Sequence, residues 1–133
     1  MAHSTKEFFP AFQDEARKWV SRFGLIGWQL EVLCQNQEEQ PDVGDAKAIC
    51  RAIQRGRVAQ IILNADWPDW VIPSEADVRR SAFHECCELL LMRLEWLAFD
   101  RTTTTEQFEE ERHIVIRTLE NAVFAHEHPK EEK

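Results

Sequence analysis

Residues 81–91, SAFHECCELLL, form the most informative segment of the chain. In a helix, His84 and Glu88 lie one turn apart and stack on the same face, whereas Glu85 lies about 100° around the axis. The residues after Glu88 are apolar on nearly every side of such a helix, which is typical of a buried one. The segment therefore predicts a central helix with two possible metal ligands on one face.

This motif helix is expected to run from Ser74 to Phe99. Ser74 followed by Asp77 is similar to the capping box that starts many helices. A further helix should follow, because residues 102–105 are all Thr and offer N-caps. Its apolar face is predicted to consist of Phe108, Val115, Leu119 and Ala122.

Three strands are predicted before the motif helix. Residues 28–33 alternate between apolar and polar, as in a half-buried strand. Residues 48–54 and 57–63 flank Arg55-Gly56, a turn signal that predicts a hairpin. The chain begins with an amphipathic helix that ends near Phe23, since Gly24 is a typical C-terminal cap.

Together these elements predict an α+β fold. Its order is an N-terminal helix, a small three-stranded antiparallel sheet, the long motif-bearing helix and a C-terminal helix. No linker or repeat divides residues 1–133, so we expect a single domain that is ordered from about residue 6 to about residue 124. Residues 126–133 are charged and lack an apolar anchor, which predicts a frayed tail.

The composition argues against several classes of partner. The 16 Lys and Arg residues against 24 Asp and Glu residues give a net charge of −8, which repels nucleic acids and anionic lipids. The longest strongly apolar stretch, residues 89–92, is too short to cross a membrane, and the first ten residues contain no apolar run behind a basic segment. We therefore expect a cytoplasmic protein that binds neither nucleic acid nor membrane.

The four cysteines do not form a recognisable metal or disulfide motif. Cys34, Cys50, Cys86 and Cys87 lack the spacing of a disulfide framework or of a zinc knuckle. Adjacent helix positions such as Cys86 and Cys87 point in different directions and cannot both face one site. We expect reduced thiols that pack as small apolar side chains.

Residues 84–88 are similar to the zinc-binding motif of a class of hydrolases. Zinc hydrolases with the motif His-Glu-x-x-His hold the metal through two residues one turn apart, and the intervening Glu takes a proton from the attacking water. The chain resembles small zincin-like proteins, many of them from phages and prophages, which are related to minimal gluzincin metallopeptidases. The resemblance covers most of the chain and rests on residues 24–28, 58–64, 84–91 and 109–113.

The resemblance implies that His84 binds Zn²⁺ and that Glu85 is the general base. Glu88 stands where the family has its second His. A carboxylate is also a zinc ligand, so metal binding can survive this change, but the added negative charge weakens the Lewis acidity of the ion. In that family an acidic residue of the later helix completes the site.

Three residues of the later helix are candidates for this third ligand: Glu110, Glu111 and His113. Glu110 and His113 share one helix face. His113 would restore a set of two His and one Glu. Glu111 lies on the apolar stripe of its helix, so it should face inward and needs a partner such as a metal ion, an Arg or His84.

We therefore predict a zinc-binding, metallopeptidase-like hydrolase of phage or prophage type that acts on a peptide or protein. Glu85 would be its catalytic residue. The alternative is an inactive relative that keeps the zincin fold as an interaction or structural protein with a vestigial site. An enzyme needs a coordination position that solvent can reach, whereas a vestigial site would pack Glu88 against an Arg or Lys.

Overall fold

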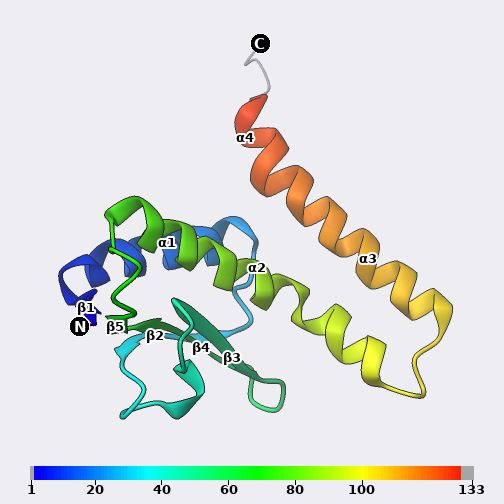
Figure 1. Ribbon diagram of the computed structural model, residues 1–133. Coiled ribbons are helices and arrows are strands. Elements are labelled where there is room, and N and C mark those ends of the chain that lie inside the picture. The colour runs from blue at the N-terminus through cyan, green and yellow to red at the C-terminus, as the bar shows by residue number, and fades with distance from the viewer. Residues whose placement is uncertain (1, 130–133) are drawn as a thin grey trace.

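A sheet of three strands forms the base of the fold in the computed structural model, which describes residues 2–129. β2 (Gln29–Gln35), β3 (Ala48–Ile53) and β4 (Val58–Asn64) lie in the order β2-β4-β3 (Figure 1). β4 pairs antiparallel with β3, which confirms the predicted hairpin, but it pairs parallel with β2. The sheet is therefore mixed, and the prediction of a fully antiparallel sheet is wrong for the pairing of β2.

β4 takes the central position because it is the most apolar of the three strands. Ala59, Ile61, Ile62 and Leu63 are all completely buried. A strand in which adjacent residues such as Ile61, Ile62 and Leu63 are all apolar and buried is typically covered on both faces. No residue of β2 is buried to this degree. Since the chain reverses direction from β2 to β3 and again to β4, the insertion of β4 between them makes β2 and β4 parallel.

The hairpin between β3 and β4 turns at the predicted position. The Arg57 N–H donates to the Gln54 carbonyl at 3.3 Å. Gly56 has a φ of 88° and Arg57 a φ of 51°, so the turn needs left-handed backbone at two consecutive positions. Glycine adopts this conformation without the steric conflict of a Cβ atom, which explains the turn signal at Gly56.

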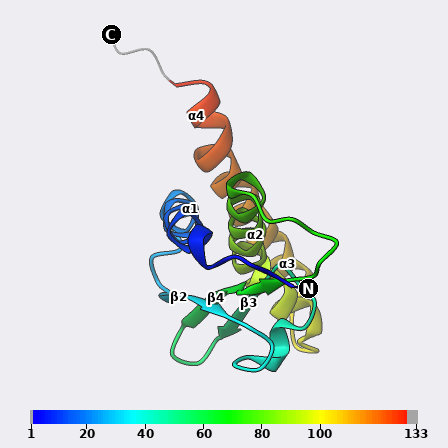
Figure 2. The same ribbon diagram turned by 60° about the vertical axis from the view of Figure 1, so that its left-hand side comes forward.

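Two helices cover one face of the sheet (Figures 1 and 2). α1 (Phe9–Arg22) buries Phe12 and Ala16. α2 (Glu75–Phe99) begins as predicted, because the Ser74 hydroxyl accepts the Asp77 N–H at 3.1 Å. The shared core contains the following buried residues: Phe12, Ala16, Phe23, Ala48, Ile61, Leu63, Trp67, Val78, Ala82, Cys86, Leu90, Val115 and Ala122.

The last helix turns back from the end of α2 and then extends away from the sheet (Figures 1 and 2). α3 (Thr105–Leu119) starts with a capping box in which Thr104 and Gln107 bond each other's backbone. A π turn (Glu120–Phe124) and the short α4 (Ala125–Glu127) continue it. Val115 and Ala122 are buried and attach this arm to the core.

Short elements complete the fold, and the side chain of Asn64 holds the loop that leads into β3. β1 (His3–Ser4) pairs with β5 (Asp66–Trp67), and two 3-10 turns lie at Lys6–Phe8 and Pro41–Val43. The buried amide of Asn64 donates to the carbonyls of Gly44 at 3.4 Å and Ala46 at 2.9 Å. These bonds hold residues 46–48 in place beside α2.

Helical structure continues to Glu127, past residue 124, where the ordered domain was expected to end. Residues 130–133 of the predicted tail lie outside the described residues. Within residues 2–129, no helix combines the length and the apolar character needed to cross a bilayer.

Candidate metal centre

Three possible metal ligands lie together on α2. His84 Nε2 and Glu88 Oε1 are 3.5 Å apart, as expected for residues one helical turn apart. One donor atom each from His84, Glu85 and Glu88 lies within 4.8 Å of the other two. Imidazole nitrogen and carboxylate oxygen are both ligands of divalent metals in proteins. The group can therefore hold a metal ion.

The three residues differ sharply in exposure. The side chains of His84 and Glu88 are 69 % and 52 % exposed, whereas Glu85 is only 5 % exposed. Glu85 is buried because it continues the stripe of buried residues on α2 that includes Ala82 and Leu89. Its Oε2 atom has no hydrogen-bond partner, which is costly for a buried oxygen. An unsatisfied oxygen thus lies beside two exposed ligands.

The electrostatics of the group favour a cation. Burial raises the pKa of Glu85 to about 8, and the charge of Glu88 and a hydrogen bond with Glu88 act in the same direction. Burial, with the charges of Glu85 and Glu88, also raises the pKa of the Cys50 thiol to about 12. Cys50 therefore stays protonated near neutral pH. A bound cation would offset the negative charges and favour the ionised form of Glu85.

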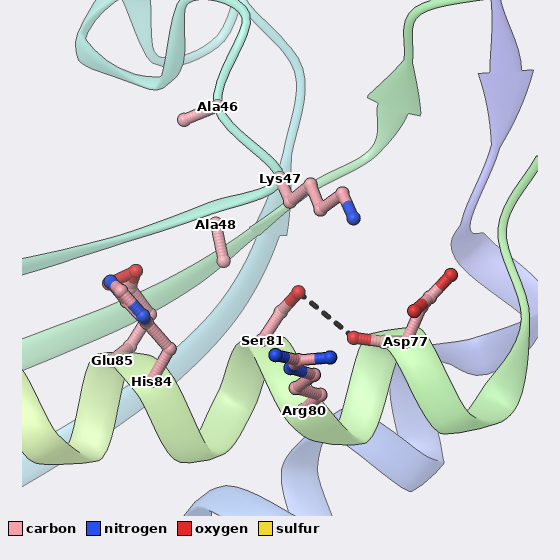
Figure 3. A pocket seen from close by; sticks show the side chains of 8 residues that line it. All are labelled: Ala46, Lys47, Ala48, Asp77, Arg80, Ser81, His84 and Glu85. Carbon is pink, nitrogen blue, oxygen red and sulfur yellow. Dashed lines mark hydrogen bonds between the residues drawn. The ribbon is translucent and has the colours of Figure 1, made fainter. Parts of the chain in front are cut away.

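A cleft of about 470 Å³ lies beside the ligands, between α2 and residues 46–48 (Figure 3). His84 and Glu85 line one end of it, Asp77 lines the other, and Ser81 lies between them (Figure 3). The Ser81 hydroxyl donates to the Asp77 carbonyl at 3.0 Å, a bond within the helix that keeps this side chain in place. Two of the three candidate ligands, His84 and Glu85, therefore border a space that a small part of a substrate can occupy.

Two basic side chains also line the cleft: Lys47 and Arg80. Lys47 precedes β3, and its Nζ lies 5.2 Å from the ring centre of the buried Trp67. Arg80 rises from α2, one turn before His84, and is exposed. These cations give an otherwise acidic protein a local site for an anionic group.

The candidates for a third ligand lie on α3, away from this group. Glu111 is 9 % exposed, which confirms that it faces inward, and its Oε1 lies 3.6 Å from Arg93 Nε. Glu110 and His113 are exposed. Among the described residues, the group that can hold a metal ion includes none of these three. The ligands that the structure brings together all come from α2.

Sequence reasoning missed two features of the site. The burial of Glu85 could have been found, since Glu85 follows Val78 and Ala82 at the spacing of one helix face. The basic side chains of Lys47 and Arg80 carry no local signal, because their proximity depends on how the loop before β3 packs beside α2.

No protein-family model matches the chain, and neither does any curated protein or solved structure. The function must therefore be inferred from the α+β fold, the His-Glu-Glu group and the cleft beside it.

Proposed function

We propose that this chain binds Zn²⁺ through His84 and Glu88 and hydrolyses peptide bonds, with Glu85 as the general base. The observation that carries the proposal is the meeting of three donor atoms within 4.8 Å of one another, two of them from residues, His84 and Glu85, that line an open cleft. The resemblance of residues 84–91 to the motif of zincin-like metallopeptidases supports the same function.

The residues present fit a zinc ion. Imidazole nitrogen and carboxylate oxygen are both zinc ligands, and both occur together in catalytic zinc sites. The exposure of His84 and Glu88 leaves room for solvent and substrate at the ion. In the described ion pairs Glu88 contacts His84 and no Arg or Lys, in contrast to what a vestigial site predicts. The buried, unpartnered Oε2 of Glu85 adds a second carboxylate that a cation would stabilise.

Glu85 has the properties of a proton acceptor. When bound, Zn²⁺ would supply Lewis acidity that polarises the scissile carbonyl. Glu85 lines the cleft, and its buried Oε2 atom makes no hydrogen bond. A general base is most effective when its pKa lies near the working pH. The pKa of Glu85, which is raised to about 8 without metal, would fall toward neutral pH beside a cation.

The free edge of β3 suggests how a peptide would bind. β3 is an edge strand, and within the described chain its outer side pairs with no other strand. Extended peptides bind such edges through backbone hydrogen bonds. Residues 46–48, which lead into β3, line the same cleft as His84 and Glu85. A peptide that pairs with β3 would therefore pass the ligands, with Lys47 and Arg80 close to any acidic side chain.

A metal-binding module without catalysis is the second candidate. It is favoured by the pairing of Glu111 with Arg93, because α3 then adds no ligand to the group on α2. Catalytic zinc sites usually have three protein ligands that surrounding residues hold in place. Here two of the three donors are more than half exposed.

Cleavage of an unstructured protein such as casein by the zinc-loaded, tag-free chain separates the two candidates. A hydrolase should cleave it, and Glu85→Gln should keep zinc but lose activity by about 100-fold or more. His84→Ala should lose both zinc and activity. His113→Ala is the matched control, since His113 is exposed on α3, and it should change neither.

Zinc binding without cleavage would support the module and contradict the hydrolase. Equal loss of zinc in Glu85→Gln and His84→Ala would show that Glu85 is a ligand rather than the base. Absence of zinc binding in the unaltered chain would contradict both candidates.

A further inference from the structure

We propose that two copies of this chain pair through one face of α3 and the π turn that follows it, with their helices antiparallel. The face consists of Ile116, Leu119, Val123 and Phe124, which we call the outer stripe. These side chains are 40–63 % exposed although all are large and apolar. Contiguous exposed apolar residues are typical of an interaction surface, in contrast to scattered single ones.

The outer stripe is separate from the face that attaches the arm to the rest of the protein. Glu111, Val115 and Ala122 are the buried residues of this arm, and they lie on one side of it. Ile116, Leu119 and Val123 follow each other at spacings of three and four residues on the neighbouring side. The stripe thus repeats the pattern by which two helices pack together.

The π turn at Glu120–Phe124 widens this stripe. A π turn contains more residues per turn than an α-helix, so it delays the rotation of the side chains that follow. Phe124 is thereby brought toward the side of Val123. The ring of Phe124 also packs against His128, with 4.6 Å between ring centres. The π turn thus gathers apolar side chains on one side of the arm.

A groove of about 510 Å³ runs along the outer stripe and is bordered by Glu120 and Glu127. The arm extends away from the sheet and the other helices, so a second helix can approach it (Figures 1 and 2). An occupant of this groove must bring an apolar surface of its own.

The charges beside the stripe are complementary to those of a second, antiparallel copy, which we therefore infer to be the occupant. Arg112 precedes the stripe on the same side of the helix, Glu127 follows it, and both are exposed. They are equidistant in sequence from the Leu119–Glu120 peptide bond, and so are Ile116 and Val123. A two-fold axis at that bond therefore places Arg112 of each copy opposite Glu127 of the other, with one such pair at each end of the interface.

The same axis sets Ile116 against Val123 of the second copy, so that apolar layers meet between the two charge pairs. A parallel arrangement would instead set Arg112 against Arg112 and Glu127 against Glu127, which repel. Two-fold pairing of identical surfaces is the commonest form of protein oligomer. The arrangement of charge and apolar residues fits this symmetry.

Light scattering during gel filtration tests the proposal on the full, tag-free chain. Over concentrations of about 1–100 µM, the mass should rise from 15.6 kDa toward twice that value. Leu119→Glu should keep the protein monomeric throughout, because it places charges at the centre of the interface. Ile72→Glu is the matched control: Ile72 is equally apolar and 76 % exposed but lies outside the stripe, so the mass should be unchanged.

Charge exchange tests the orientation and does not depend on the folding of Leu119→Glu. Arg112→Glu and Glu127→Arg should each weaken pairing by about tenfold. The double variant should regain the affinity of the unaltered chain. A mass of 15.6 kDa at every concentration would overturn the proposal and assign the stripe to a different partner. A dimer that Leu119→Glu leaves intact, or a double variant without recovery, would overturn the proposed interface.

Discussion

Glu111 on α3 lies against Arg93 on α2, with 3.6 Å between its Oε1 and the Arg93 Nε. The two side chains differ in exposure, since 52 % of Arg93 but only 11 % of Glu111 is accessible. The contact fixes α3 against the second half of α2. It also engages the acidic residue of α3 that faces inward, so this carboxylate is not available to the ligands on α2.

Removal of Arg93 should cost more stability than removal of Glu111. Arg93→Ala leaves a carboxylate with little solvent and no partner, and we expect a loss of about 1–3 kcal/mol in the free energy of unfolding. Glu111→Ala leaves an Arg that water can solvate, so its loss should be smaller. Urea unfolding of both variants measures the difference, and equal losses would show that the burial of Glu111 adds little to the cost of removing its partner.

Glu85→Gln should stabilise the metal-free protein in a pH-dependent way. The pKa of Glu85 is raised from 4.5 to about 8 on folding, so folding favours its protonated form. The stability this contributes is complete below pH 4.5 and is lost as the pH rises to about 8. Gln cannot ionise, so the variant should match the unaltered chain near pH 4.5 and exceed it by about 1–3 kcal/mol at pH 8.

Thermal unfolding of both proteins in chelator, from pH 4.5 to pH 8.5, checks this expectation. Parallel curves for the two proteins would mean that Glu85 ionises in the folded state as easily as in the unfolded chain.

Amide hydrogen exchange should be slowest in β4. β4 is bonded on both sides, to β2 and to β3, and four of its apolar residues are completely buried. Strands in the core of a sheet open only with the whole protein, whereas edge strands fray. Mass spectrometry of exchanged peptides should therefore find the greatest protection in residues 58–64. Greater protection of β3 would indicate the consecutive strand order β2-β3-β4 instead.

Glu88→His should raise the affinity for zinc by about tenfold or more. The change completes the motif His-Glu-x-x-His, and a second neutral imidazole binds zinc without further negative charge. It also removes the charge that contributes to the raised pKa of Glu85. A zinc titration of both proteins gives the ratio of affinities. A lower affinity and a lower melting temperature together would mean that Glu88 has a structural role.

The local signals of this sequence predicted its elements well. Ser74 begins α2, Thr104 begins α3 and Gly56 turns the hairpin, because caps and turns depend on neighbouring residues alone. The order of the strands was missed, since it depends on which strand can be buried on both faces. The apolar run of residues 61–63, with Ala59 before it, is the local feature that favours the central position for β4.

The site was predictable only along α2. His84 and Glu88 lie as their spacing requires, since both belong to one helix. The inward position of Glu111 also followed from the apolar stripe of its helix. Its ion pair with Arg93, in place of a contact with the candidate ligands, could not be predicted, because this contact depends on where α3 packs on α2. Contacts within one element follow from spacing, and contacts between elements do not.

The most direct test of the proposed metal site is a calorimetric titration of Zn²⁺ into the tag-free, chelator-treated chain, with His84→Ala and Glu88→Ala beside it. We expect one ion per unaltered chain, little or no binding by either variant, and a rise in melting temperature with zinc for the unaltered chain alone. An unaltered chain that gives no binding heat and no thermal shift, or a His84→Ala variant that binds zinc equally well, would contradict the proposed site.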